Sequence, residues 1–484
     1  MSELPEGAAA VDVRAIADGA RVELSSAQFD VLAAGRVTVL AALASGTRPV
    51  YGVNTGMGRF AGVPLTPEQQ ARHQRNLLIG RAVGGPPWLP ERDVRALLAA
   101  RLQDFLAPGA GVSAELVRFL AERLNDGFVP AVPRAGLGSA GEIIPLAHAF
   151  QTFAGIGTVL DGEDEVPAAD ALSRRGVEPY VPGPKEGVSL IQGAPLARAH
   201  AVLRGVDAAR AVEVTLLCTA GAADILGAPL AGYDPALGGT DSVLTDVLGE
   251  VFALVEGAAV REDVVQVPVS ARVGPRAIAH ARRVLRELAE TVERAIGVPA
   301  DSPAFIDGGF VSTTGFHAVD LGLRMDAVTA ALVHLGEIGV QRLHRVLDDR
   351  FTGLPAQLAA EPGPQAGLSP LHKRAAGELH ALRRLAAPAT LGSADTSAGQ
   401  EDVQAFAPAA GEQLRAAVEH LTVISACELI AAFQADHLRG GGTAAPGVDA
   451  VYAWVGETVD PVLVDRPLGP DLERLGKRLK LLDA

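Results

Sequence analysis

Residues Ala211–Leu226 read AVEVTLLCTAGAADIL, and residues Ala327–Val340 read AVTAALVHLGEIGV. Apolar residues recur in both stretches at spacings of three and four, which is the pattern of an α-helix. The few charged side chains leave almost no polar face, and a helix that is apolar on nearly every face is buried all round. We therefore expect these stretches to pack against each other, or against the same helices in other copies of the chain.

Both stretches are the middle portions of longer helical patterns. Three such patterns are expected, near residues 194–228, 316–350 and 408–438. Strand-like alternation is short and rare, so the chain is predicted to be mainly α, a long-helix bundle completed by homo-oligomerisation. We predict two domains, an N-terminal active-site domain (1–193) and a central long-helix bundle with C-terminal helices (194–484).

Shorter helices are expected before the long ones. The sequence TPEQ at 66–69 combines an N-cap, a proline at the first helical position and a residue that can reach back, which predicts a helix to about Val83. Pro and Gly punctuate the rest of this part of the chain. They predict two more helices at about 90–106 and 113–125, and loops at 161–188 and 351–370.

Composition and charge limit the classes of partner. The 484-residue chain carries a formal net charge of −15 without a basic block, so we expect no nucleic acid and no anionic membrane surface as partner. The N-terminus lacks the positive start and apolar core of a signal peptide, and no run of about 18 uncharged apolar residues appears. Cys218 and Cys427 lie in apolar helical runs, without the spacing of a metal site or a redox motif. A cytoplasmic protein that binds a small molecule is expected.

The segment 51–58 reads YGVNTGMG and holds one of four tyrosines in a loop with three glycines. Glycine permits positive φ angles and lets a ligand approach the backbone closely. A structural turn does not require a tyrosine, although a tyrosine packed on a surface loop is common. Tyr51 and Asn54 are therefore candidates for a binding or catalytic site.

The order of these residues resembles a known family. YGVNTGMG is similar to the YGVNTGFG loop of the histidine, phenylalanine and tyrosine ammonia-lyases and the related aminomutases. The resemblance implies the ammonia-lyase fold, a homotetramer and a small substrate that bears a carboxylate. Further segments resemble that family in the same order along nearly the whole chain: NLLIGRAVGG at 76–85, PLAHAF at 145–150, KEGVSLIQG at 185–193, residues 266–276, FHA at 316–318 and QED at 400–402.

One segment departs from the family pattern. In the relatives an Ala-Ser-Gly tripeptide cyclises and loses two waters, which gives a methylidene-imidazolone electrophile. Here residues 135–148 read AGLGSAGEIIPLAH, and aligning PLAH sets Ser139-Ala140-Gly141 against that tripeptide. The central residue must supply a β-hydroxyl, which Ala140 lacks. We therefore expect the methylidene-imidazolone group to be absent, with no other cofactor and no metal.

Two other interpretations of this segment remain open. A shift of one residue makes Gly138-Ser139-Ala140 the cyclising unit and keeps a central serine, but it moves that serine farther from Pro145 and replaces the third glycine. Alternatively, Ser139 is an N-cap ahead of a helix with Pro145 in its first turn. The N–H groups of that turn would still form an anion site.

The resemblance also implies roles for polar residues. In the segment QVPVSARVGPR at 266–276, Arg272 stands where the family's arginine grips the substrate carboxylate, a task that suits a bidentate guanidinium. The family's tyrosine in this segment is replaced by Val269. Gln192 stands where the relatives usually have asparagine, and His317 is expected to pack rather than to catalyse.

Arg81 stands where histidine ammonia-lyases read histidine, at a position that helps to recognise the substrate's ring. A guanidinium there suits an anionic group or a ring oxygen, so Arg81 and Arg272 would hold the two ends of one acid. A structural ion pair is the alternative for Arg81. Glu401 in the QED segment is expected to be partly buried and to take part in proton transfer. Gln400 beside it and Phe316 are expected near the substrate.

The candidate residues together indicate acid–base chemistry. The predicted catalytic residues are Tyr51, Arg272, Glu401 and Gln192, and the predicted substrate-binding residues are Arg81, Asn54, Gln400 and Phe316. The leading expectation is an enzyme without the methylidene-imidazolone group that catalyses elimination, isomerisation or cyclisation of a small carboxylate-bearing substrate. The alternatives are a working aromatic amino acid ammonia-lyase or aminomutase, and a non-catalytic relative that binds a ligand.

Overall fold

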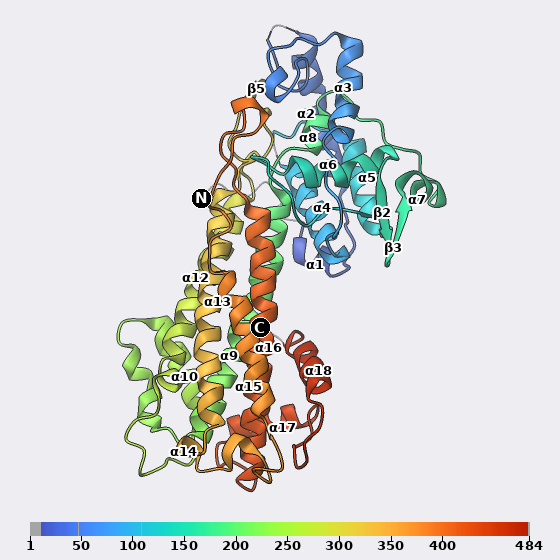
Figure 1. Ribbon diagram of the computed structural model, residues 1–484. Coiled ribbons are helices and arrows are strands. Elements are labelled where there is room, and N and C mark those ends of the chain that lie inside the picture. The colour runs from blue at the N-terminus through green and yellow to red at the C-terminus, as the bar shows by residue number, and fades with distance from the viewer. Residues whose placement is uncertain (1–10, 47, 108, 483–484) are drawn as a thin grey trace. The chain divides into compact units, whose positions relative to one another are not determined.

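A computed structural model describes residues 11–46, 48–107 and 109–482. These residues form two compact units, each assembled from several chain segments (Figure 1). Unit 1 contains the chain up to Leu203 with Ala289–Met325 and Ala389–Glu412, and unit 2 contains Arg204–Leu288, Asp326–Pro388 and Gln413–Ala484. The two units alternate along the chain, whereas the sequence analysis placed one boundary at 193/194; as a functional division that boundary stays a prediction.

Unit 1 combines short helices with two small antiparallel sheets. One sheet has the strand order β1-β2-β3, and the other is the β4-β5 pair. Its strands are β1 (Val129–Pro130), β2 (Thr158–Asp161), β3 (Asp164–Pro167), β4 (Ala304–Ile306) and β5 (Gly309–Val311). Its helices are α1 (Val13–Ala17), α2 (Ser26–Ala44), α3 (Pro67–Ile79), α4 (Glu91–Leu106), α5 (Ala114–Asn125), α6 (Ile143–Gln151), α7 (Ala168–Arg174) and α8 (Glu186–Leu190).

Long helices dominate the rest of the chain, as the sequence analysis predicted. Four of them have residues in both units: α9 (Pro195–Ile225), α12 (Gly274–Ala295), α13 (Val319–Val346) and α16 (Ala407–Leu438). Unit 2 adds α10 (Ser242–Val255), α11 (Val269–Arg272), α14 (Asp349–Thr352), α15 (Ser369–Arg384), α17 (Pro446–Gly456) and α18 (Gly469–Leu479). Within unit 2, α13, α15 and α16 lie side by side (Figure 1). They approach closely because Gly336 of α13 has no Cβ, which would otherwise lie 2.6 Å from Leu382.

The capping signals predicted the start of α3 correctly. The Thr66 side chain accepts the Gln69 N–H, and the Gln69 side chain accepts the Thr66 N–H, which forms a capping box. The helix ends at Ile79 rather than near Val83. The Ser113 side chain caps α5 by accepting the Leu116 N–H.

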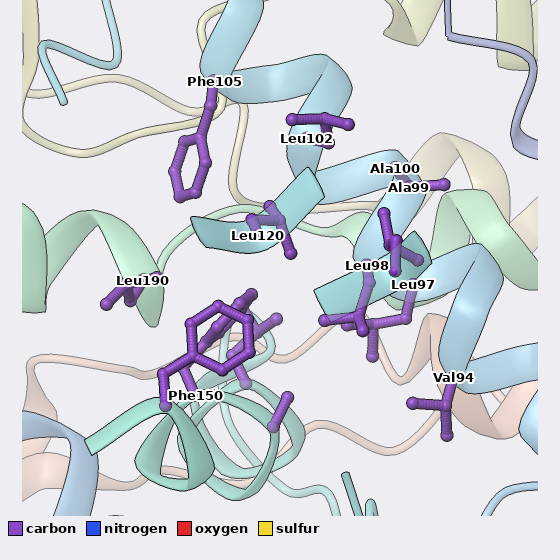
Figure 2. Close-up of a cluster of buried hydrophobic side chains, with 14 of the residues drawn as sticks. Val94, Leu97, Leu98, Ala99, Ala100, Leu102, Phe105, Leu120, Phe150 and Leu190 are labelled. Carbon is purple, nitrogen blue, oxygen red and sulfur yellow. The ribbon is translucent and has the colours of Figure 1, made fainter. Parts of the chain in front are cut away.

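The core of unit 1 lies around α4, whose apolar side chains face those of α5, α6 and α8 (Figure 2). Leu97, Leu98 and Leu102 of α4 are fully buried. Leu120, Phe150 and Leu190 from the other three helices complete this cluster of buried side chains (Figure 2). Burial of each such side chain stabilises the fold by about 1.5–3 kcal/mol, so this cluster gives the loops around it a rigid base.

The prediction of a loop at 161–188 was wrong. This segment contains the end of β2, the strand β3, the helix α7 and the start of α8. Gly162, with a φ of 64°, lies in the turn between β2 and β3. The residues of β3 are mostly exposed, so their polar, charged side chains resemble those of a loop when only the sequence is read.

Within the ranges that the structure describes, two helices are long and apolar enough, by length and composition, to cross a membrane. In α16 the apolar window is 72% buried, as in a core helix, whereas in α2 it is 11% buried. Val31 and Val37 of α2 are about 70% exposed. A membrane partner was not expected, and its absence stays a prediction. Cys218 and Cys427 are free and buried, as predicted.

Candidate active site

The tyrosine loop at 51–58 is held in one conformation by its glycines and its own backbone. Gly52 has a φ of 70°, a conformation that favours glycine. A Cβ at Gly56 would lie 2.6 Å from the carbonyl oxygen of Phe60, so no larger residue fits there. The Gly58 N–H donates to the Tyr51 hydroxyl oxygen over 2.8 Å. The phenol is thereby fixed in place.

The Asn54 side chain stabilises the loop by two hydrogen bonds to the backbone before Tyr51. Its Oδ1 accepts the Val50 N–H over 2.6 Å, and its Nδ2 donates to the Arg48 carbonyl over 3.0 Å. Gln74 of α3 anchors the loop by donating to the Gly52 carbonyl over 3.0 Å. Asn54 lines neither of the cavities that Tyr51 lines. Its observed contacts therefore position the loop, and its predicted contact with a substrate stays a prediction.

Tyr51 and Glu401 line two adjoining cavities within unit 1. The larger cavity has a volume of about 440 Å³ and is also lined by Arg81 and Ser139. The smaller cavity has a volume of about 280 Å³. Its lining also includes Ala140, Glu142, Gln192, Phe316 and Gln400. Most of the predicted site residues are thus brought together around these two cavities.

The segment 138–142 borders both cavities, with Ser139 at the larger one and Ala140 at the smaller one. The Ser139 Oγ donates to the Gly141 carbonyl over 2.6 Å. The helix α6 begins only at Ile143, and its N-cap is Glu142. The interpretation of Ser139 as a helix N-cap was therefore wrong, because its hydroxyl stays within the segment before the helix.

Glu401 is presented by a tight turn. Its backbone pairs with Thr396, through the Thr396 N–H to the Glu401 carbonyl at 2.8 Å. One carboxylate oxygen accepts the Ser397 hydroxyl over 2.8 Å, and the other accepts the Ala140 N–H over 2.9 Å. The carboxylate thus contacts the backbone of the altered tripeptide directly. Glu401 is partly buried, as predicted.

Arg81 follows α3 and places a guanidinium in the larger cavity. Burial lowers the pKa of Arg81, while the neighbouring Tyr51 and Glu401 act in the opposite direction. In the part of the chain that the structure describes, Arg81 forms no ion pair within 4 Å. The alternative of a structural ion pair therefore lacks support, and the positive charge faces the cavity.

Glu142 is a buried acid that the sequence analysis did not single out. Its two carboxylate oxygens accept the N–H groups of Leu196 and Ala197 at the start of α9, over 2.6 and 2.7 Å. Burial raises the pKa of Glu142 to about 8, although the two N–H donors and Arg198 act in the opposite direction. In the sequence, Glu142 is a single charged residue between Gly141 and an apolar helix, and this position could have indicated a buried acid.

Arg272 belongs to unit 2, where it ends the short helix α11 and its Nε donates to the Val267 carbonyl over 3.0 Å. Its predicted grip on a substrate carboxylate stays a prediction. His317 has a buried Nε2 that makes no hydrogen bond to the described residues. It lines a separate cavity of unit 1 with Phe316 and Arg198.

One group of described residues has the spacing of metal ligands: Asp93 of α4, His200 of α9 and Glu412 of α16. His200 Nε2 lies 3.7 Å from an Asp93 oxygen and 3.5 Å from a Glu412 oxygen. Arg134 pairs with the other Glu412 oxygen at 2.6 Å. Each carboxylate thus already faces a protein partner, and the predicted absence of a metal stays a prediction.

One cavity thus unites a phenol, a guanidinium and a carboxylate beside the altered tripeptide, in a mainly helical fold. The family model described as aromatic amino acid lyase matches residues 9–457. The chain therefore belongs to the aromatic amino acid lyase family.

Individual relatives agree with this assignment. The chain is 34% identical over 487 residues to a histidine ammonia-lyase from Streptomyces avermitilis, covering 96% of this chain and 94% of the relative. It is 32% identical over 445 residues to a histidine ammonia-lyase from Symbiobacterium thermophilum, covering 89% and 87%. Among solved structures, a tyrosine aminomutase from Streptomyces globisporus matches with a TM-score of 0.91 at 25% identity, covering 97% of this chain and 94% of that one.

These relatives contradict the leading functional expectation. Histidine ammonia-lyases and aminomutases of this family use the methylidene-imidazolone group, and several relatives named histidine ammonia-lyase match nearly the whole chain. The prediction of an enzyme without this group was therefore wrong, and so was the expectation that the chain has no cofactor. The comparisons favour the alternative of a true aromatic amino acid ammonia-lyase.

The segment fits the methylidene-imidazolone group in one register. With Ala140 at the centre, no hydroxyl is available for dehydration. With Ser139 at the centre, the hydroxyl is present, and the Ala140 N–H that would supply the ring nitrogen donates to Glu401. Gly138, Ser139 and Ala140 are therefore the residues that fit the group.

Proposed function

We propose that the chain is an ammonia-lyase that eliminates ammonia from an aromatic amino acid. The observation that carries this proposal is the joint lining of one cavity by Tyr51, Arg81, Ser139 and Glu401. The relatives named histidine ammonia-lyase support it. When present, the methylidene-imidazolone group supplies the electrophile that makes ammonia a competent leaving group.

Tyr51 is the proposed base that removes the proton from the carbon next to the substrate's ring. A base must lie within hydrogen-bonding reach of its proton, and Tyr51 lines both cavities. The Gly58 N–H that donates to the phenol oxygen and the nearby charge of Arg81 both stabilise negative charge on that oxygen. The reaction then leaves an α,β-unsaturated acid conjugated with the ring.

Arg81 supports a substrate whose ring carries an anionic or hydrogen-bond-accepting group. A half-buried guanidinium that faces a cavity is best stabilised by a carboxylate, a phenolate or a ring acceptor. Gln192, Gln400 and Phe316 line the smaller cavity and are proposed to orient the rest of the substrate. Arg272 is proposed to hold the substrate carboxylate, as the family resemblance implies.

An aminomutase is the second candidate, because the chain is 25% identical to the tyrosine aminomutase with a TM-score of 0.91. An aminomutase returns the amino group to the neighbouring carbon, whereas a lyase releases it. The two activities therefore differ in their products. Assembly into a homotetramer and a cytoplasmic location remain predictions.

The test is product analysis with the purified full chain. Histidine, phenylalanine, tyrosine and a carboxyl-substituted phenylalanine are supplied separately, and ammonia and the unsaturated acid are measured together. The proposal predicts equal amounts of both from at least one substrate. A β-amino acid without free ammonia would favour the aminomutase. The absence of all three products, from protein shown to be folded by its circular dichroism, would overturn the proposal.

A further inference from the structure

The altered segment lacks the central hydroxyl of the family's tripeptide only when Ala140 is placed at the centre. A methylidene-imidazolone ring takes the carbonyl carbon of its first residue, the backbone nitrogen, Cα and carbonyl carbon of its second residue, and the amide nitrogen of its third, while the β-carbon of the second residue becomes the exocyclic methylidene. The Cα and side chain of the third residue stay outside the ring. Ala140 is therefore excluded from the second position, because it has no hydroxyl, but it is chemically admissible in the third.

The hydrogen bonds around the segment favour the shifted register. In the register 138–140 the attacking atom is the Ala140 nitrogen, whose N–H lies 2.9 Å from a carboxylate oxygen of Glu401. In the register 139–141 it is the Gly141 nitrogen, whose N–H donates to no residue that the structure describes. A carboxylate can accept the proton that this nitrogen releases when the ring closes, whereas the Gly141 N–H has no such acceptor among the described residues. The Glu401 carboxylate therefore lies within hydrogen-bonding distance of the Ala140 nitrogen, which is the attacking atom in the shifted register.

The surroundings of Ser139 agree with its place at the centre of the ring. Ser139 and Gly138 line the larger cavity with Tyr51 and Arg81. A carbon derived from the Ser139 side chain would therefore lie in the cavity that also contains the phenol. A Cβ at Gly138 would meet nothing within 4 Å, so the backbone at the first position has space to bend toward Ala140.

We propose that the chain carries an autocatalytic modification site at Gly138-Ser139-Ala140, one residue earlier than the sequence alignment places it, with Glu401 as the base. The proposal rests on the proposed function for its purpose, since the ring is the electrophile that ammonia elimination needs. Glu401 is a catalytic residue of ring formation, because it touches the reacting nitrogen.

The atoms balance without an oxidant. The Ala140 nitrogen bonds to the Gly138 carbonyl carbon, and its proton passes to Glu401. The Gly138 oxygen leaves as water with that proton and the proton of the Ser139 nitrogen, which forms a carbon–nitrogen double bond. Ser139 then loses its α-hydrogen and its hydroxyl as a second water, which leaves the exocyclic carbon–carbon double bond. The net change is the loss of two waters.

The test is intact-mass spectrometry of the purified full chain, followed by fragmentation of the peptide that contains residues 135–148. The expected result is a mass two waters below that of the sequence, localised to residues 138–140, with absorbance in the near ultraviolet. Ser139→Ala should lose at most one water and lack the absorbance. Full sequence mass in the unaltered chain, or the loss of two waters in Ser139→Ala, would overturn the proposal.

Two matched variants keep the test independent of folding. Ala140→Gly retains the shifted register and puts the family's glycine at the third position, so it should lose two waters at least as readily as the unaltered chain. Glu401→Gln should keep the native circular dichroism but mature at least about tenfold more slowly, because general bases typically contribute 10²–10⁴-fold. Maturation of Glu401→Gln at the unaltered rate would contradict the role of Glu401.

The experiments distinguish a failure of the proposed modification site from a failure of the proposed function. Loss of two waters without release of ammonia from any aromatic amino acid would keep the modification site and overturn the lyase. Release of ammonia by protein of full sequence mass would keep the lyase and overturn the site. Both measurements use the same preparation.

Discussion

Two regions of unit 1 treat buried charge in opposite ways. Around Asp301 the chain supplies every partner, since Lys185 donates to one carboxylate oxygen over 2.9 Å and Arg101 to the other over 2.7 Å. All three side chains are at least 97% buried. In the larger cavity, by contrast, the half-buried guanidinium of Arg81 has no ion pair with any residue in the described ranges.

The difference indicates where a ligand belongs. A buried charge without a counter-charge costs several kcal/mol, so folds neutralise such groups with their own residues. The Asp301 cluster shows that this chain does so where the charge is structural. A charge that is left facing a cavity is therefore available to a ligand of opposite charge.

The largest effect is expected from Tyr51→Phe. The loss of the proton acceptor should reduce kcat by about 10²–10⁴-fold, the usual contribution of a general base, while the thermal midpoint changes little. Steady-state release of ammonia measures the change. Tyr180→Phe is the matched control, because its hydroxyl contacts Glu186 rather than the two cavities. Equal activity of the two variants would remove Tyr51 from the mechanism.

Asp301→Asn should have the largest effect on stability. It leaves the buried charges of Lys185 and Arg101 without their shared carboxylate, which typically costs about 3–5 kcal/mol. Urea denaturation should show a lower midpoint than for Asp263→Asn, a change at an exposed ion pair. Similar midpoints for both variants would show that the cluster is not structural.

The same variant has a predicted pH dependence. Burial acts to raise the pKa of Asp301, but Lys185 and Arg101 more than compensate and hold it below the ordinary value of 3.8. The carboxylate therefore contributes its stability above pH 3.8, and this contribution is lost as the pH falls through the lowered pKa. The difference between the unaltered chain and Asp301→Asn should shrink in that acidic range, and a constant difference would contradict the assignment.

Arg81→Gln should change selectivity rather than stability. A hydrogen bond to a charged group contributes about 1.5–3 kcal/mol, so the ratio of kcat/KM for carboxyl-substituted phenylalanine to that for phenylalanine should fall by about 10–100-fold. A ratio cancels any general effect of the charge on Tyr51. Arg75→Gln, at an exposed position of α3, should leave the ratio unchanged. An unchanged ratio in Arg81→Gln would show that the charge does not face the substrate's ring.

Glu142→Gln should change how the stability of the protein depends on pH. Burial raises the pKa of Glu142 from 4.5 to about 8, so the unfolded chain releases this proton at a lower pH than the folded chain. The unaltered protein should therefore lose stability relative to Glu142→Gln as the pH rises from about 4.5 to 8, and the difference should level off above that range. Thermal midpoints across this range measure it, and a difference that moves the other way would contradict the raised pKa.

The long helices could be predicted from the sequence because their apolar residues repeat with the period of the helix. The predicted ranges 194–228 and 408–438 correspond to α9 (Pro195–Ile225) and α16 (Ala407–Leu438). The capping box at Thr66 located α3 for the same reason, since the relevant contacts are local. The amphipathic helix α12 was missed, and the exposed strand β3 was read as a loop because its polar residues lack a strand pattern.

The residue types of the site could be predicted from the sequence. Which three residues of the segment 138–141 form the ring could not. Aligning PLAH placed Ala140 at the centre of the tripeptide and led to a wrong prediction about the cofactor. The contact that favours the other register joins Ala140 to Glu401, which are 261 residues apart in the chain. The acid at Glu142 was missed for a similar reason, because its burial depends on its hydrogen bonds to the start of α9.

The most direct test of the central claim is an electron-density map across residues 138–142 in the unaltered chain. The account predicts a closed five-membered ring made from Gly138, Ser139 and Ala140, with an exocyclic carbon that lies in the cavity beside Tyr51. An ordinary peptide there, with the Ser139 hydroxyl present and the Ala140 N–H still donating to Glu401, would contradict it.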